Sequence, residues 1–360
     1  MRTMKFVIHI ILTILLTVKL LVAIQEVKLE QISIVATPEL KFYLPNGAID
    51  LKLNENIMNT MVDFAYRYDL YYSFIYSKLD CRYNFSDKKY FLGLDLLEQV
   101  YFETLFSPTN MIQRVRHIMP YLGYNLTKDM NITGSIIYEN TYSATVDTAL
   151  VLDKGKNFHG QLNLFYNTLD ENKPLPKGNR ISVNIKHSLG ELGSEYDYTQ
   201  LDTNLTKYIY LLGINHMIRT CLQLGYPLYT KKRPLSDIYY MGGYNILHGY
   251  KFNEFSGNTM IYTRLSYHIP LILNLHEENL LSSSIEIVTT DLVWEFAKIG
   301  DTKIFDTVKG MKSSVGIGAG AKVRLFNVLN LQFNLLIAQA ISIRAPVIHF
   351  TLTAISYIAK

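Results

Sequence analysis

Residues 241–271, MGGYNILHGYKFNEFSGNTMIYTRLSYHIPL, decide the fold of this chain. The stretch opens on a glycine pair, continues through the tetrad at 247–250, and passes a short polar loop. A strictly alternating segment follows, with Tyr262, Arg264, Ser266 and His268 on one face and Ile261, Thr263, Leu265, Tyr267 and Ile269 on the other. Since successive side chains of a strand point to opposite faces, this pattern predicts a wall strand with one wet and one apolar face.

The same two-residue alternation recurs along most of the chain. From residue 258 onward, five segments are predicted strands: 258–271, which ends the stretch, then 282–296, 312–325, 328–342 and 346–358. About eleven more precede it: 58–68, 69–84, 88–97, 98–108, 112–126, 129–142, 144–153, 157–168, 179–191, 197–212 and 214–229. Their lengths suit tilted membrane-crossing strands of roughly 9–11 residues. The sum is near sixteen strands.

A sheet with an even number of antiparallel strands can close on itself and leave no free edge. In hydrocarbon this closure is required, because each unpaired backbone group costs several kcal/mol. We therefore expect an all-β fold, a transmembrane antiparallel barrel of about sixteen strands. A soluble sandwich is the alternative, but it needs polar outer faces, whereas here one apolar face persists from strand to strand.

The N-terminus has the pattern of a secretory signal. Arg2 and Lys5 precede an apolar core over residues 6–18, so residues 1–24 are predicted to be a signal peptide. An uncleaved anchor is the alternative. Residues 25–56 number too few to fold alone, where roughly 40 are needed, and are expected to be a short periplasmic lead segment. The barrel is then expected over 57–360.

Composition narrows the function. The chain has 360 residues, 49% hydrophobic and 18% charged, with 27 Tyr, and phenol rings suit membrane interfaces. The net charge is only +4, and no basic patch stands out in the sequence, which argues against nucleic-acid binding. Two cysteines, Cys81 and Cys221, are too few for a disulfide scaffold and lack the spacing of a metal site, although they leave one disulfide as an alternative. No cofactor and no metal is expected.

Catalytic motifs are not found either. The sequence contains neither a G-x-S-x-G elbow nor an HExxH pair, so we expect no enzyme. The run SVGIGAGAK at 314–322 superficially resembles a phosphate-binding loop, but its alternation continues to Leu325 instead of opening a helix. These glycines are better explained as inward positions that make room in a barrel lumen.

The opening stretch carries a family resemblance. Gly242-Gly243, the tetrad Leu247-His248-Gly249-Tyr250, and a strand that ends His268-Ile269-Pro270-Leu271 resemble the C-terminal barrel of the BamA/TamA-type outer-membrane assembly family, also called the bacterial surface antigen family. In that family a glycine pair and an aliphatic-Arg-Gly-aromatic tetrad lie in a long loop that folds back into the lumen, between the eleventh and twelfth of sixteen strands. The resemblance therefore predicts the same inward loop here.

The chain departs from the family at three charged positions. His248 stands where the family has arginine, Thr289 aligns with its acidic partner on the thirteenth strand, and Ser266 aligns with the glutamate of the twelfth. The alignment predicts that all three positions are changed together, so Ser266 and Thr289, with His268, become the expected loop-to-wall contacts. Such a neutral set would form weaker hydrogen bonds than a charge-assisted pair.

The resemblance implies a bacterial outer-membrane protein that acts as an insertase or takes part in translocation. Its partners would be outer-membrane lipid and unfolded outer-membrane proteins or a separate periplasmic module. The length leaves no room for the family's own periplasmic modules, so a stand-alone barrel is expected. The alternative is a passive channel or structural barrel without assembly activity.

Overall fold

The computed structural model describes most of the chain after residue 38. The described segments are 39–44, 48–57, 59–69, 74–85, 89–102, 111–145, 151–170, 176–211, 216–243, 246–251, 254–276, 284–300, 310–325, 329–341 and 346–356. Within them the chain forms eighteen strands and two short 3₁₀ turns, η1 (Gly190–Leu192) and η2 (Leu235–Asp237). The predicted signal peptide lies outside these segments.

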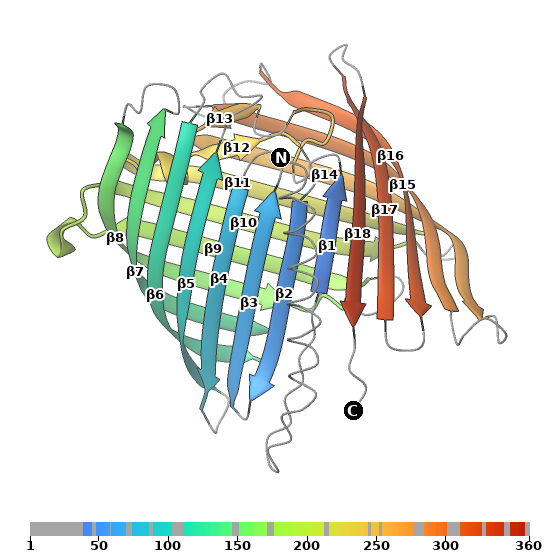
Figure 1. Ribbon diagram of the computed structural model, residues 1–360, viewed down its shortest axis with the longest axis horizontal. Helices are drawn as coiled ribbons and strands as arrows, with labels where there is room; N and C mark the ends of the chain where they lie inside the picture. Colours follow the sequence, from blue (N-terminus) through green and yellow to red (C-terminus); the bar gives the residue numbers. More distant parts are fainter. Residues whose placement is uncertain are drawn as a thin grey trace, which may run out of the picture.

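Sixteen of the strands form one closed antiparallel barrel, in which strands that follow each other along the chain pair with each other (Figure 1). β1 pairs with both β2 and β18, and this pairing closes the wall. The wall strands are β1 (Glu39–Leu44), β2 (Ala48–Ile57), β3 (Thr60–Asp69), β4 (Phe74–Asn84), β5 (Tyr90–Phe102), β6 (Met111–Thr127), β7 (Met130–Thr145), β8 (Val151–Asn167), β9 (Gly178–Ser188), β10 (Asp197–Tyr210), β11 (Met217–Lys232), β14 (Thr259–His276), β15 (Ser284–Gly300), β16 (Lys312–Leu325), β17 (Leu329–Ala340) and β18 (Val347–Ser356).

The predicted all-β fold, the sixteen strands and the five strands after the opening stretch are confirmed. Two pairs of predicted strands are wrong, however. Where the structure describes them, segments 88–97 and 98–108 both fall on the single strand β5. The described end of 144–153, residues 151–153, falls on β8 together with nearly all of 157–168, and residues 144–145 end β7. Gly155 lies within β8, where a Cβ would be only 2.7 Å from the Tyr196 hydroxyl. The absence of a side chain at Gly155 therefore lets the Tyr196 ring lie directly against β8.

The predicted lead segment at 25–56 is also wrong where the structure describes it. β1 and most of β2 fall in this range and are wall strands, so the barrel begins by residue 39 instead of 57. These residues need not fold alone, because their backbone groups pair with β3 on one side and β18 on the other. The two strands missed here offset the two counted twice, and the total stays at sixteen.

The two faces of the wall differ as the alternation predicts. Outward side chains such as Leu265, Ile317 and Ile348 keep 39%, 60% and 56% of their surface exposed, a lipid-facing pattern. Inward positions carry polar, charged and small residues among apolar ones such as Ile287 and Val293, and Gly318 and Gly320 line a cavity in the lumen. A soluble sandwich does not fit this closed, apolar-faced wall. Among the described residues no helix is long and apolar enough to cross a membrane.

The connection from β11 to β14 is the largest described departure from the wall. It contains η2 and a small two-stranded sheet of β12 (Tyr239–Met241) and β13 (Phe255–Gly257), which pair with each other. We call residues 233–258 the insertion. The end of the barrel at which the insertion leaves the wall is called the loop end. Because all neighbours are antiparallel, the last residues of β5 and the first residues of β6 lie at the loop end too.

Candidate functional site in the barrel lumen

The glycine pair and tetrad form two tight turns. Gly242 and Gly243 have φ values of +119° and +95°, and a Cβ on Gly242 would lie 2.0 Å from the Lys251 carbonyl oxygen. Leu247 also adopts a left-handed φ of +57°, which is uncommon for a residue with a side chain. Its side chain is fully buried among Met241, Tyr250 and other apolar residues, which holds this conformation in place.

The tip of the insertion, formed by the tetrad at 247–250, binds a single buried carboxylate, that of Glu295 on β15. The His248 backbone N–H donates to Oε2 at 2.8 Å, and the His248 Nδ1–H donates to Oε1 at 2.7 Å. Two wall hydroxyls complete the shell, as Tyr262 donates to Oε1 and Ser314 to Oε2, both at 2.6 Å. Four donors around one carboxylate compensate the cost of burying its charge.

Further contacts fix the tip against three more strands. His349 of β18 donates from Nε2 to the His248 carbonyl oxygen at 2.8 Å, and the two imidazole rings stand perpendicular, 5.1 Å apart. The Tyr250 hydroxyl donates to the Ser313 carbonyl oxygen at 3.2 Å. Gly249 lies so close to β17 that a Cβ would be 2.4 Å from the Ala340 nitrogen. The insertion is therefore folded into the lumen.

The predicted loss of the acidic partner is wrong. The sequence comparison aligned the family's acidic partner with Thr289, whereas the acid that binds His248 is Glu295, one residue after Trp294. Both residues face inward on β15, and Glu295 lies three inward positions after Thr289. Glu295 was overlooked, although its position between the outward Trp294 and Phe296 identifies it as inward. Burial lowers the pKa of the His248 imidazole, and the attraction of Glu295 opposes this only in part.

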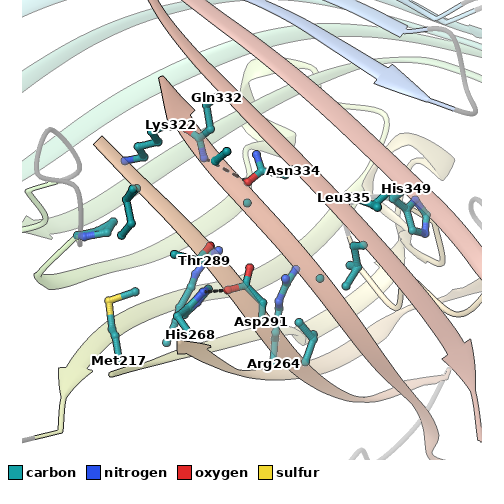
Figure 2. A pocket seen from close by; sticks show the side chains of 18 of the residues that line it. Met217, Arg264, His268, Thr289, Asp291, Lys322, Gln332, Asn334, Leu335 and His349 are labelled. Carbon is teal, nitrogen blue, oxygen red and sulfur yellow. Dashed lines mark hydrogen bonds and ion pairs between the residues drawn. The ribbon is translucent and has the colours of Figure 1, made fainter. Parts of the chain in front are cut away.

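The three expected loop-to-wall contacts, Ser266, His268 and Thr289, lie nearby, and the first two bond within the wall. Ser266 accepts a hydrogen bond from Arg264 Nε at 3.0 Å, and His268 Nδ1 lies 2.6 Å from Asp291 Oδ1. Together with Thr289 and His248, His268 lines a cavity of about 290 Å³ in the lumen (Figure 2). His268 and Thr289 thus remain candidates for the function of the cavity, whereas Ser266 is buried and is not among its lining residues. The direct partner of the tip is Glu295.

The cavity has an uneven charge. Arg219, Arg264 and Lys322 contribute cationic groups to its lining, whereas Asp291 is its one carboxylate among the lining residues described. His268 already faces that carboxylate. Gln332 and Asn334 add neutral polar groups on β17, as Figure 2 shows. The lumen beneath the insertion is therefore polar and net cationic.

A second attachment holds the start of the insertion to β8, β9 and β10, and no sequence motif predicts it. Asp237 of η2 accepts from Lys186 Nζ at 3.0 Å and from the Tyr198 hydroxyl. The Leu235 backbone N–H donates to Asp153 Oδ2 at 2.9 Å. Burial alone would raise the pKa of Asp237, but Lys186 and the Tyr198 hydrogen bond outweigh it and hold this pKa below its ordinary value. Asp237 stays charged at neutral pH.

The remaining sequence candidates carry no site. Cys81 and Cys221 are both free thiols. Within the described residues, no group of three or more His, Cys, Asp or Glu side chains is placed to hold a metal ion.

A closed sixteen-stranded barrel with a lipid-facing outer wall and an insertion bound inside its lumen is a transmembrane barrel of the outer-membrane type. The family model of the Omp85 superfamily domain matches residues 48–325. The chain therefore belongs to the Omp85 superfamily, and it is a bacterial outer-membrane barrel of the assembly and translocation type.

Solved structures agree on the fold. BamA from Haemophilus ducreyi lacking POTRA domains 1–3 superposes with a TM-score of 0.69 at 17% identity, over 90% of this chain and 70% of that one. CdiB from Escherichia coli gives a TM-score of 0.62 at 11% identity, over 92% and 69%. CdiB from Acinetobacter baumannii gives 0.57 at 12%, over 91% and 60%. A comparison with curated protein sequences gives no significant match.

Proposed function

We propose that this barrel assists the insertion of other barrel proteins into the outer membrane, or their translocation across it. The observation that carries the proposal is the weak seam between the first and last strands. β1 has six residues and pairs with β18 over six positions, whereas β14 and β15 pair over sixteen. β1 pairs with β2 over only five positions, so the two ladders of β1 are the shortest described in the wall. Fewer ladder hydrogen bonds make the wall easiest to open on either side of this strand.

An open seam would expose two strand edges, and an edge recruits an extended chain by strand addition. The client strand would pair with β18 or β1 before it leaves into the lipid. We expect clients to be unfolded outer-membrane proteins, delivered directly or by a separate periplasmic module. We propose no catalysed reaction, because proteins of this superfamily generally serve assembly and transport.

The insertion has a defined place in this mechanism. His349 lies on β18, the seam strand, and holds the carbonyl oxygen of His248 at the tip of the insertion. The same tip is bound to Glu295 on β15. Release of the tip would therefore remove a contact that braces β18 from inside the lumen.

The test is a reversible lock on the seam. Lys41 and Thr353 are paired positions of β1 and β18, and both would be changed to cysteine after Cys81→Ser and Cys221→Ser. Liposomes with this variant would receive an unfolded outer-membrane barrel as client, and its folding rate would be measured by heat-modifiable gel mobility. Oxidation should abolish the acceleration and reduction should restore it.

A matched disulfide between the paired positions Val323 and Leu331 of β16 and β17 is the control, because it lies within the wall away from the seam. Client folding should be unaffected by oxidation of this control. If the locked seam leaves the client rate unchanged, the assembly proposal is wrong.

The second candidate is a passive channel, which the cationic lining of the lumen cavity favours, since basic residues lining a pore select anions. A channel would carry a steady anion-selective current across a planar bilayer, and deletion of 244–255 would leave that current in place. Locking the seam would not change it. The two candidates are therefore separated by the same variant.

A further inference from the structure

The outer face of β3–β7 carries two adjacent cross-strand rows of opposite character. The first row is apolar and joins Phe64, Leu79, Leu96, Ile118 and Tyr138, each the direct partner of the next. The second row joins Ser77, Glu98, Arg116 and Asn140 in the same way. Ile118 is 50% exposed on the outward face, so both rows face away from the lumen.

The polar row lies toward the loop end. β5 runs toward the loop end, and Glu98 follows Leu96 by two residues, which places the rows about 7 Å apart along the strand. Arg114 lies one further row in the same direction, opposite Val100 and Tyr142. Charged side chains on a lipid-facing wall are disfavoured at the membrane centre and tolerated near its surface. The boundary between the rows therefore lies at the headgroup level of the leaflet at the loop end.

The charges of this outer cluster are arranged as two cations on one anion. Arg114 donates from Nε and Nη2 to Glu98 Oε1 at 3.2 and 2.6 Å, and Arg116 does so at 3.0 and 2.8 Å. The cluster keeps a net charge of +1, and its side chains are 41–54% exposed. Each guanidinium uses one edge on Glu98, which leaves its Nη1 group available to a further acceptor.

A groove connects the two rows. It has a volume of about 420 Å³, and its lining includes the apolar row together with Ser77, Glu98, Arg116 and Asn140. An elongated ligand with an apolar tail and an anionic head would match the order of the lining. Guanidinium groups bind phosphate through paired N–H donors, which makes phosphate the best-matched head.

We propose that this groove binds a membrane lipid with a phosphorylated headgroup, its acyl chain on the apolar row and its phosphate on Arg116, which lines the groove, and on Arg114, one row beyond it. Glu98 holds the two guanidinium groups side by side and at the same time competes with the phosphate for them. The site lies outside the lumen, and it requires neither the seam nor the insertion.

Native mass spectrometry of the full chain in detergent tests the proposal, with bisphosphorylated lipid A as the probe and the same lipid after removal of its phosphates as its counterpart. We expect one phosphorylated lipid per barrel, and about tenfold weaker binding of the dephosphorylated form. Arg114→Gln with Arg116→Gln should weaken binding of the phosphorylated lipid about tenfold as well. Lys207→Gln, which removes an exposed cation at the other rim, should leave binding unchanged.

Glu98→Gln distinguishes a lipid site from a structural ion pair. Removal of the competing carboxylate raises the net charge of the cluster, so binding of the phosphorylated lipid should tighten. Each variant is first shown to be folded by heat-modifiable gel mobility. Equal binding of both lipid forms, wild-type binding by the double arginine variant, or weaker binding by Glu98→Gln would each overturn the proposal.

Discussion

The two attachments of the insertion use the same chemistry with the roles exchanged. At the tip, the carboxylate belongs to the wall, and the insertion supplies the donors through the backbone and side chain of His248. At the start, the carboxylate belongs to the insertion as Asp237, and Lys186 of the wall supplies the cation. The start adds a backbone bond from Leu235 to Asp153, but its charged pair joins two side chains, whereas at the tip the backbone and the side chain of one residue donate to the same carboxylate.

This difference explains how histidine can occupy the family's arginine position. The His248 N–H reaches Glu295 whatever side chain residue 248 carries, and Tyr262 and Ser314 add two donors from the wall. The imidazole completes the shell as a neutral donor. What the tip requires is the turn that aims the backbone, which depends on Gly249 and on the left-handed Leu247.

The largest effect is expected from Glu295→Ala. It leaves four donor groups at the tip and wall without their buried acceptor, so the free energy of unfolding should fall by about 3–5 kcal/mol. Urea titration of the barrel in lipid measures this. Glu286→Ala on the same strand, whose partner Arg324 is largely exposed, should cost only about 0–1 kcal/mol. Equal losses would show that the tip is not specially held by Glu295.

Asp237→Ala should lower the free energy of unfolding somewhat less, by about 3 kcal/mol, because it leaves the buried Lys186 without its anion. Lys186→Met in the same chain should recover part of this loss, since the uncompensated cation is then removed as well. The same urea titration, run as a double-mutant cycle, gives the coupling energy. Strictly additive losses would contradict a direct pair.

His248→Ala should cost about 1–2 kcal/mol, less than either carboxylate change, because the backbone bond to Glu295 remains. Protease resistance of the insertion should fall only slightly in this variant and strongly in Glu295→Ala. A loss as large as that of Glu295→Ala would mean that the side chain, and not the backbone, holds the tip.

The smallest effect is a difference in pH dependence. The pKa of His248 lies below its ordinary 6.5, so the unfolded chain takes up more protons and the stabilisation at the tip declines as pH falls from 6.5. The pKa of Asp237 lies below 3.8, so its contribution is kept until pH falls past 3.8. Between these values the cost of His248→Ala should shrink while that of Asp237→Ala stays constant. The reverse order would contradict the assignment.

Local patterns predicted the wall well. Alternation over β14 and β16 identified inward and outward faces correctly, because strand periodicity needs only neighbouring residues. Glu295 was missed because its pairing with His248 depends on how a loop folds across the lumen, which sequence spacing does not encode. Asp237 and Lys186 lie 51 positions apart without any motif. The family resemblance identified the tip, and only the register of the barrel revealed its partner.

Hydrogen exchange at residues 246–251 of the wild-type barrel in lipid tests the central claim most directly. The His248 N–H is buried against Glu295, and the Tyr250 N–H bonds the Leu247 carbonyl oxygen, so both amides should exchange as slowly as those of the wall. Glu295→Ala should release the protection at 248. Rapid exchange of the wild-type segment, at the rate of an exposed loop, would contradict an insertion bound within the lumen.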